Sequence, residues 1–171
     1  MDRAFAEIRT LGDPVLKEQA KPVLNFDDRL VRLATLMSEA MDREEGVGLA
    51  ATQLGVLTRL IVWRHPDEDD VLRVLANPEI VEQSESCSVA SEGCLSVPGA
   101  SVEVSRPDEI LVAGCDLDGG MIELLLQGLA ARIVQHEIDH LDGRLILDRA
   151  TPEERRRAMK DLRERTAAAQ Q

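Results

Sequence analysis

The sequence predicts an α+β fold in which antiparallel sheets wrap around a central metal-binding helix, with a further helix at the C-terminus. Two observations predict it. Strand-like segments cluster ahead of the helix that carries His136 and His140, and strands and helices do not alternate along the chain. This order is typical of α+β domains. The chain of 171 residues shows no internal repeat and no linker, so we expect one catalytic domain over residues 1–171.

The first half of the chain is expected to hold an arm, a helix and the first strands. Residues 1–26 resemble an extended arm with a turn at 12–14, and Asp27 is a cap for a helix that ends near Glu44. A loop opens at 46–48. The buried face of the helix is marked by Leu30, Leu33, Ala34, Met37 and Met41. Strands are expected at 60–63, 71–76 and 79–83, with a polar turn over 65–70.

The second half is expected to hold a loop at 91–99, more strands and two helices. Gly128 precedes a helix of about 13 residues, which ends at Asp142-Gly143, where glycine suits a left-handed cap. Thr151 begins a charged helix that continues to about Thr166, and the last residues are expected to fray. Strands are expected at 101–104, 110–115 and 121–126, with a hairpin at 118–120 and a short extended piece at 145–147.

Composition and charge argue against several classes of function. Aromatic residues make up 2% of the chain, which disfavours stacking on single-stranded nucleic acid. A net charge of -12 is poorly suited to binding DNA or anionic lipid. We find no apolar run long enough for a membrane span, no signal-peptide core and no disulfide framework among three cysteines. A cytoplasmic location is therefore expected, without a membrane or DNA partner.

The most informative feature is the H-E-x-x-H pattern of residues 136–140. Residues four apart share one helix face, so His136 and His140 can bind one metal ion with Glu137 beside it as a proton carrier. A third ligand is needed. His65 is one option, but Cys94 is better placed, in a glycine-containing loop. The other two cysteines, Cys87 and Cys115, are interpreted as small buried hydrophobic residues.

Three blocks together resemble the peptide deformylases. They are Gly46-Val47-Gly48-Leu49-Ala50-Ala51-Thr52-Gln53, Glu92-Gly93-Cys94-Leu95-Ser96 and Gln135-His136-Glu137-Ile138-Asp139-His140. The resemblance implies that Cys94, His136 and His140 hold one divalent ion, Fe(II) first and zinc, nickel or cobalt as alternatives. It implies that Glu137 moves the proton, and that Gln53 and the backbone N–H of Leu95 stabilise the oxyanion. The implied reaction removes the formyl group from N-formylmethionyl nascent peptides and releases formate.

The resemblance also suggests how the substrate is bound. A methionine side chain needs an apolar pocket, and Val47, Leu129, Ile133 and His136 are the candidate lining. Core packing is the alternative role for Leu129 and Ile133. At Gly48, the absence of a side chain lets a peptide backbone come close. The stretch 99–103 lacks the arginine or aromatic residue that the family often carries near the outer substrate positions.

Two supporting contacts are predicted around these blocks. The family pattern implies that Asp139 pairs with Arg106 as a structural ion pair. Glu92 either orients the cysteine loop or is merely a solvated carboxylate.

Two other functions stay open at this point. A zinc endopeptidase would share the two histidines and Glu137. A non-catalytic, ribosome-associated paralogue is favoured by the tail, because residues 151–171 carry six Lys/Arg against four Asp/Glu. In the family such a helix can dock on the ribosome; a salt-bridged, solvent-facing helix is the alternative. The basic side chains concerned are Arg155, Arg156, Arg157, Lys160, Arg163 and Arg165.

Overall fold

The structure is a computed structural model, and it describes residues 7–65 and 71–169. The expected turn after His65 and the expected fraying of Gln170 and Gln171 lie outside these residues, as does the side chain of Arg165. Within them the α+β prediction is confirmed. One sheet has the strand order β1-β2-β3-β6-β7, a second has β4 and β5, and all neighbouring strands are antiparallel.

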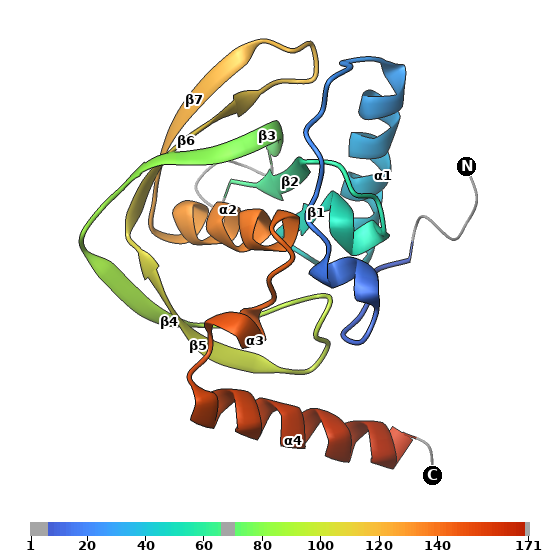
Figure 1. The fold of residues 1–171 in the computed structure, drawn as a ribbon, viewed down its shortest axis with the longest axis vertical. Helices are drawn as coiled ribbons and strands as arrows, with labels where there is room; N and C mark the ends of the chain where they lie inside the picture. Colours follow the sequence, from blue (N-terminus) through green and yellow to red (C-terminus); the bar gives the residue numbers. More distant parts are fainter. Residues whose placement is uncertain (1–6, 66–70, 170–171) are drawn as a thin grey trace.

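The strands have the following bounds: β1 Gly48–Ala50, β2 Leu60–Arg64, β3 Leu72–Gln83, β4 Cys87–Gly93, β5 Ser101–Pro107, β6 Glu109–Cys115 and β7 Met121–Gln127. The helices are α1 Asp28–Arg43, α2 Gly128–Leu141, α3 Ile146–Arg149 and α4 Pro152–Ala169, with short 3₁₀ turns η2 Pro14–Lys17 and η3 Ala51–Leu54. Helix α2 lies in the middle of the molecule, with the large sheet and the β4–β5 ribbon around it (Figure 1).

Strand β2 is buried on both faces, because α2 packs on one side of the large sheet and α1 on the other. Its alternate residues Ile61 and Trp63 belong to the core cluster that includes α2, whereas Leu60 and Val62 belong to the cluster that includes α1. Side chains in a strand alternate between its two faces, so a strand buried on both faces is apolar throughout. The run Leu60–Trp63 is fully buried, as this arrangement requires.

Helix α1 follows the predicted pattern closely. The carboxylate of Asp27 accepts hydrogen bonds from the backbone N–H groups of Arg29 and Leu30, which satisfies two donors at the helix start. The predicted apolar face is buried or partly buried, and the helix ends at Arg43, one residue before the expected limit. Its packing holds η3 and β1 in place, and these two elements form where the sequence predicted only a loop.

Strand β3 corrects the prediction of two separate strands. It is continuous over Leu72–Gln83, with irregular pairing to β6 around Asn77 and Pro78. A proline is tolerated at such an irregularity because the ladder hydrogen bond is already missing there. Asn77 takes a left-handed conformation with φ of 51°, and its side chain amide exchanges two hydrogen bonds with the backbone of Val23. The N-terminal arm is thereby fixed to the sheet.

The prediction of a loop over residues 91–99 was also partly wrong. Residues Cys87–Gly93 form β4, which pairs with β5 along its whole length, and only the segment after Gly93 is a loop. The strand lacks the usual alternation of apolar residues because its buried inward position is occupied by Glu92. Periodicity of hydrophobic residues therefore could not reveal it.

Three smaller expectations were wrong. Residues Ile146–Arg149 form the short helix α3 instead of the expected extended piece. The prediction failed because consecutive buried apolar residues have no period that separates helix from strand. Helix α4 continues to Ala169, three residues beyond the expected end. Cys87 is exposed and Cys115 is only half-buried, so neither is the buried hydrophobic residue that was expected. The hairpin at 118–120 and the left-handed Gly143 after α2 are confirmed.

None of the helices formed by residues 7–65 and 71–169 combines the length and the apolar character that crossing a membrane requires.

Candidate metal centre and active-site cleft

Three side chains from two distant segments converge at one end of α2. Cys94 comes from the loop after β4, and His136 and His140 come from successive turns of α2. The Nε2 atom of His140 lies 3.2 Å from the sulfur of Cys94 and 3.1 Å from Nε2 of His136. All three ligand atoms lie within 4.8 Å of one another. The remaining sequence candidate, His65, follows β2 and is not part of this group.

The arrangement fits a single metal ion. A tetrahedral ion with bonds of about 2.0–2.3 Å keeps its nitrogen and sulfur ligands roughly 3.3–3.8 Å apart. The observed separations of 3.1 and 3.2 Å are close to that range. A thiolate and two imidazoles suit Fe(II), zinc and similar ions. Cys94, His136 and His140 could therefore hold one such ion and leave a coordination position open.

The charges around His136 favour a cation at this place. Burial disfavours the charged imidazole, but hydrogen bonds with Cys94 and Glu92 and the charge of Glu137 raise the pKa of His136 to about 10. His140 behaves in the opposite way, because burial and the positive charge of His136 lower its pKa. A metal ion that binds both rings must displace the proton from His136, so metal binding is expected to release protons.

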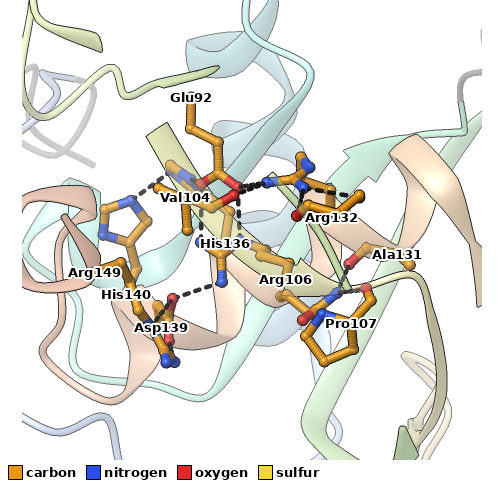
Figure 2. Close-up of polar contacts among 12 residues, drawn as sticks. Glu92, Val104, Arg106, Pro107, Ala131, Arg132, His136, Asp139, His140 and Arg149 are labelled. Carbon is orange, nitrogen blue, oxygen red and sulfur yellow. Dashed lines mark hydrogen bonds and ion pairs between the residues drawn. The ribbon is translucent and has the colours of Figure 1, made fainter. Parts of the chain in front are cut away.

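Glu92 answers the question that the sequence left open. Its side chain is buried, and Oε2 accepts a hydrogen bond from Nδ1 of His136 at 3.1 Å. Oε1 accepts from Nε of Arg106 and Nη1 of Arg132, each at 2.7 Å (Figure 2). Burial by itself raises the pKa of a carboxyl, but the hydrogen bonds from Arg106 and His136 outweigh it and hold the Glu92 pKa well below its ordinary value. Glu92 is thus an ionised orienting group.

The predicted pair of Asp139 and Arg106 is confirmed. Nη1 of Arg106 donates to Oδ2 of Asp139 at 2.9 Å, and both side chains are buried. Arg149, which the sequence did not single out, binds the same carboxylate through Nε at 3.0 Å (Figure 2). Burial opposes the charge on Arg106, but Glu92 and Asp139 raise its pKa above the ordinary value.

Glu137 lies beside the cluster, fully enclosed. Its side chain is 4% exposed, and within the described residues its Oε2 atom has no hydrogen-bond partner. Burial raises its pKa to about 7; the charges of His136 and Arg106 oppose the rise, and those of Glu92 and Asp139 add to it. A carboxyl that titrates near neutral pH is suited to accepting and returning a proton.

A glycine is needed at position 48 because the carboxylate of Glu137 lies against it. A Cβ atom at Gly48 would lie 2.5 Å from Oε1 of Glu137 and 3.0 Å from Cγ2 of Ile133. The place that a side chain would occupy is therefore already filled by the carboxylate. Close approach of a substrate backbone, the reason expected from the sequence, stays a prediction.

Two further donors lie beside the same centre. The side chain Oε1 of Gln53 accepts from the backbone N–H of Ala50 at 2.9 Å, which fixes the amide orientation. Its Nε2 then donates to Oγ of Ser96 at 3.1 Å and lies 4.0 Å from the sulfur of Cys94. Within the residues that the structure describes, the backbone N–H of Leu95 has no hydrogen-bond partner.

One cleft with a volume of about 570 Å³ is lined by Cys94, His136, Glu137, Gln53 and Leu95. Val47, Leu129 and Ile133 form apolar parts of its wall. Val47 and Leu129 are each 56% exposed, so simple core packing does not describe Leu129, whereas Ile133 is buried and also belongs to the core around α2. The sequence did not identify Arg132, although its spacing of four residues before His136 places it on the same helix face.

Comparison with known proteins gives consistent matches over most of the chain. The family described as "Polypeptide deformylase" matches residues 5–156. The peptide deformylase of Dictyoglomus thermophilum is 50% identical over 147 residues, which are 86% of this chain and 94% of that protein. The peptide deformylase of Natranaerobius thermophilus is 47% identical over 147 residues, covering 86% and 93% of the two chains.

Solved structures also match over most of the chain. The crystal structure of a peptide deformylase from Legionella pneumophila has a TM-score of 0.89 and 38% identity, and the match covers 96% of this chain and 97% of the other. The peptide deformylase from Thermotoga maritima has a TM-score of 0.81 and 44% identity, with coverage of 85% and 97%. The similarity therefore extends over most of the chain and is not limited to the three short blocks.

Proposed function

This chain belongs to the peptide deformylase family of metallohydrolases, which remove the formyl group from nascent polypeptides, and we propose how its own residues carry out that reaction. The observation that carries the proposal is the convergence of Cys94, His136 and His140 beside the enclosed carboxylate of Glu137. In this proposal the three residues are the metal ligands. A divalent ion held there supplies Lewis-acid chemistry, which lowers the pKa of water and stabilises negative charge on oxygen.

Glu137 moves the proton. Its carboxylate takes a proton from the attacking water and returns it to the departing amine. Water adds to the formyl carbon, the carbon–nitrogen bond breaks, and formate and a free N-terminal amine result. The position of Glu137 supports this role, because the residue is buried beside the metal ligands and its Oε2 atom has no hydrogen-bond partner within the described residues.

Gln53 and Leu95 stabilise the developing oxyanion. An amide nitrogen carries two hydrogens, and Ser96 takes one hydrogen bond from Nε2 of Gln53. The second hydrogen is directed at the sulfur of Cys94 at 4.0 Å, a long contact that it can exchange for the oxygen of the formyl group, and the N–H of Leu95 donates to the same oxygen. Donors that are fixed before the reaction need no reorganisation, which is the source of their effect. The bond from Ala50 to Oε1 of Gln53 supplies this fixation.

The cleft binds the N-formylmethionyl end. Val47, Leu129 and Ile133 supply apolar surface for the methionine side chain, and His136 closes the pocket. Gly48 lies on strand β1 at the wall of the cleft, where an extended peptide can run beside the strand. We propose that residues 1–171 act as one catalytic domain, and that they act in the cytoplasm, where nascent chains emerge.

We propose Fe(II) as the ion, with zinc, nickel and cobalt as alternatives. Anaerobic purification followed by elemental analysis and a formate-release assay tests this proposal directly. Iron at about one equivalent, with activity that air abolishes, is the expected result. Formyl-Met-Ala should release formate, whereas an acetylated peptide and an internal amide should remain intact. Cleavage of the internal bond alone would instead identify an endopeptidase.

A second proposal concerns α4 and the ribosome. Arg155, Arg156, Arg157, Lys160 and Arg163 are exposed, while Ala158 is buried in the cluster that anchors the helix. A basic surface held on a fixed helix can contact RNA phosphates. The ion pair of Lys160 with Glu164 at 3.8 Å fits the alternative of a solvent-facing helix.

Charge neutralisation is a sharper test than deletion of residues 151–171, because deletion would expose the cluster around Ala158. The triple variant Arg156→Gln, Arg157→Gln, Arg163→Gln should weaken ribosome binding and reduce its dependence on salt. Unchanged affinity and salt dependence would refute docking through this helix.

A further inference from the structure

Arg132 connects three segments around the candidate metal centre. It lies on α2, one turn before His136, and its side chain is 11% exposed. Nη1 donates to Oε1 of Glu92 at 2.7 Å and to the carbonyl of Val104 at 2.9 Å. Nη2 donates to the carbonyl of Ser88 at 2.8 Å and to its hydroxyl at 3.3 Å. One guanidinium thus joins α2 to both strands of the β4–β5 ribbon (Figure 2).

Arg132 completes the set of donors around Glu92. Oε1 of Glu92 accepts from Arg106 and Arg132, and Oε2 accepts from Arg106 at 2.9 Å and from Nδ1 of His136 at 3.1 Å. An ionised carboxylate has about four acceptor positions, so all are used. Because the carboxylate can only accept, the one hydrogen that the His136 ring keeps when it binds a metal ion must lie on Nδ1. Nε2 of His136 is then free to bind an ion.

The contacts of Arg132 join the two parts of the chain that supply the sulfur of Cys94 and the ring nitrogens of the histidines. Strand β4 ends at Gly93, directly before Cys94, and it carries both Ser88 and Glu92. Helix α2 carries His136 and His140. If Arg132 were removed, Arg106 would be the guanidinium group that still binds Glu92 among the described residues. Arg132 therefore links the strand that leads into Cys94 to the helix that carries the two histidines, although it lies outside the cluster itself.

We propose that Arg132 is a positioning residue for the metal centre: by bracing β4 and Glu92 against α2, it holds Cys94 and His136 at the separation that one ion needs. The inference rests on the proposed function, since it takes Cys94, His136 and His140 to be the ligands. Groups that orient metal ligands typically change metal affinity by about 10–100-fold when they are removed.

The test uses Arg132→Met, which keeps the apolar stem and removes every donor. Arg59→Met is the matched control: Arg59 is also partly buried and joins two segments, donating to Asp142 and to the carbonyl of Pro78, but it touches neither Glu92 nor the ligands. Each full-length protein is loaded with Co(II). The dissociation constant is measured by competition with a chelator, and the sulfur-to-cobalt absorption band reports on Cys94.

We expect both variants to lose thermal stability, but only Arg132→Met to weaken Co(II) binding, by about 10–100-fold, and to change the absorption band. Arg132→Lys, which keeps the charge but cannot span all the partners, should give an intermediate loss; it also serves as the test if Arg132→Met does not fold. Wild-type affinity and an unchanged band in the Arg132 variant would overturn the proposal. Failure of the proposed function itself would appear differently, as a wild-type protein that binds no stoichiometric Co(II).

Discussion

Arg106 on β5 and Asp139 on α2 form a buried ion pair at 2.9 Å, and this pair ties the two-stranded ribbon to the central helix. Asp139 sits between His136 and His140 in the sequence and about 60° from His136 around the helix, and its carboxylate contacts Arg106 and Arg149. The same helix therefore presents His136 and Glu137 to the cleft and Asp139 to a supporting network. Helical spacing alone separates the two roles.

Asp139→Asn should destabilise the protein strongly. The amide would leave Arg106 with Glu92 as its charged partner, and losing a hydrogen bond between charged groups costs about 1.5–3 kcal/mol. Asp142→Asn is the control, because Asp142 pairs with Arg59 in a more exposed place and should cost under about 1 kcal/mol. Urea unfolding of both variants gives the two values. Equal losses would contradict the structural role assigned to Asp139.

Glu137→Gln should retain the metal and lose turnover. The amide has nearly the same shape but cannot carry a proton, so kcat should fall by about 10²–10⁴-fold. Metal content and formate release are measured on the same sample. A variant with normal metal content and nearly normal turnover would show that another group moves the proton.

Gly48→Ala should lower activity by displacing Glu137. The added Cβ would come within 2.5 Å of the carboxylate oxygen. Gly93→Ala is the matched control, since its Cβ would meet only the carbonyl of Ala100 at 3.9 Å. We expect kcat to fall at least about tenfold in the first variant, because misplaced catalytic groups lose rate steeply, and little change in the second. Similar kinetics in both variants would be inconsistent with this contact.

Asn77→Ala should destabilise the arm by about 2 kcal/mol, because it removes two hydrogen bonds to Val23 and leaves a strained left-handed residue. Asn77→Gly removes the hydrogen bonds but relieves the backbone strain. The glycine variant should therefore be the more stable of the two in thermal unfolding. The reverse order would mean that the left-handed conformation is not what distinguishes this position.

Asp148→Asn should change the acid branch of the stability curve. Burial by itself would raise the pKa of Asp148, but the hydrogen bond from Leu145 and the contact with Lys17 lower it below the ordinary value. A lowered folded-state pKa adds stability that is present above the unfolded pKa of about 3.9 and disappears as pH falls through the folded value. The variant should be less stable near pH 6 by under about 1 kcal/mol, and equal to wild type near pH 2.

Thermal unfolding at both pH values checks this expectation. A difference that grows toward low pH would have the wrong sign and would contradict the assigned contacts of Asp148.

The sequence was sufficient where chemistry and spacing coincide. The spacing of His136 and His140 predicted a helix that carries both on one face. The cap Asp27 and the apolar spacing predicted the bounds of α1 to within one residue. It failed at β4, where the inward position is Glu92, and at 145–147, where uninterrupted apolar residues carry no period. Both failures have one cause: burial there is decided by distant partners rather than by local pattern.

By itself, the sequence determined which residues can bind an ion, move a proton and form the central helix, because these properties belong to side-chain chemistry and to the repeat of the helix. Only the tertiary structure decided that Cys94 meets His140, that Arg106 and Arg132 enclose Glu92, and that Glu137 fills the space beside Gly48. Such contacts join residues 14 to 89 positions apart. They follow from the way the sheets close around α2, which no local pattern specifies.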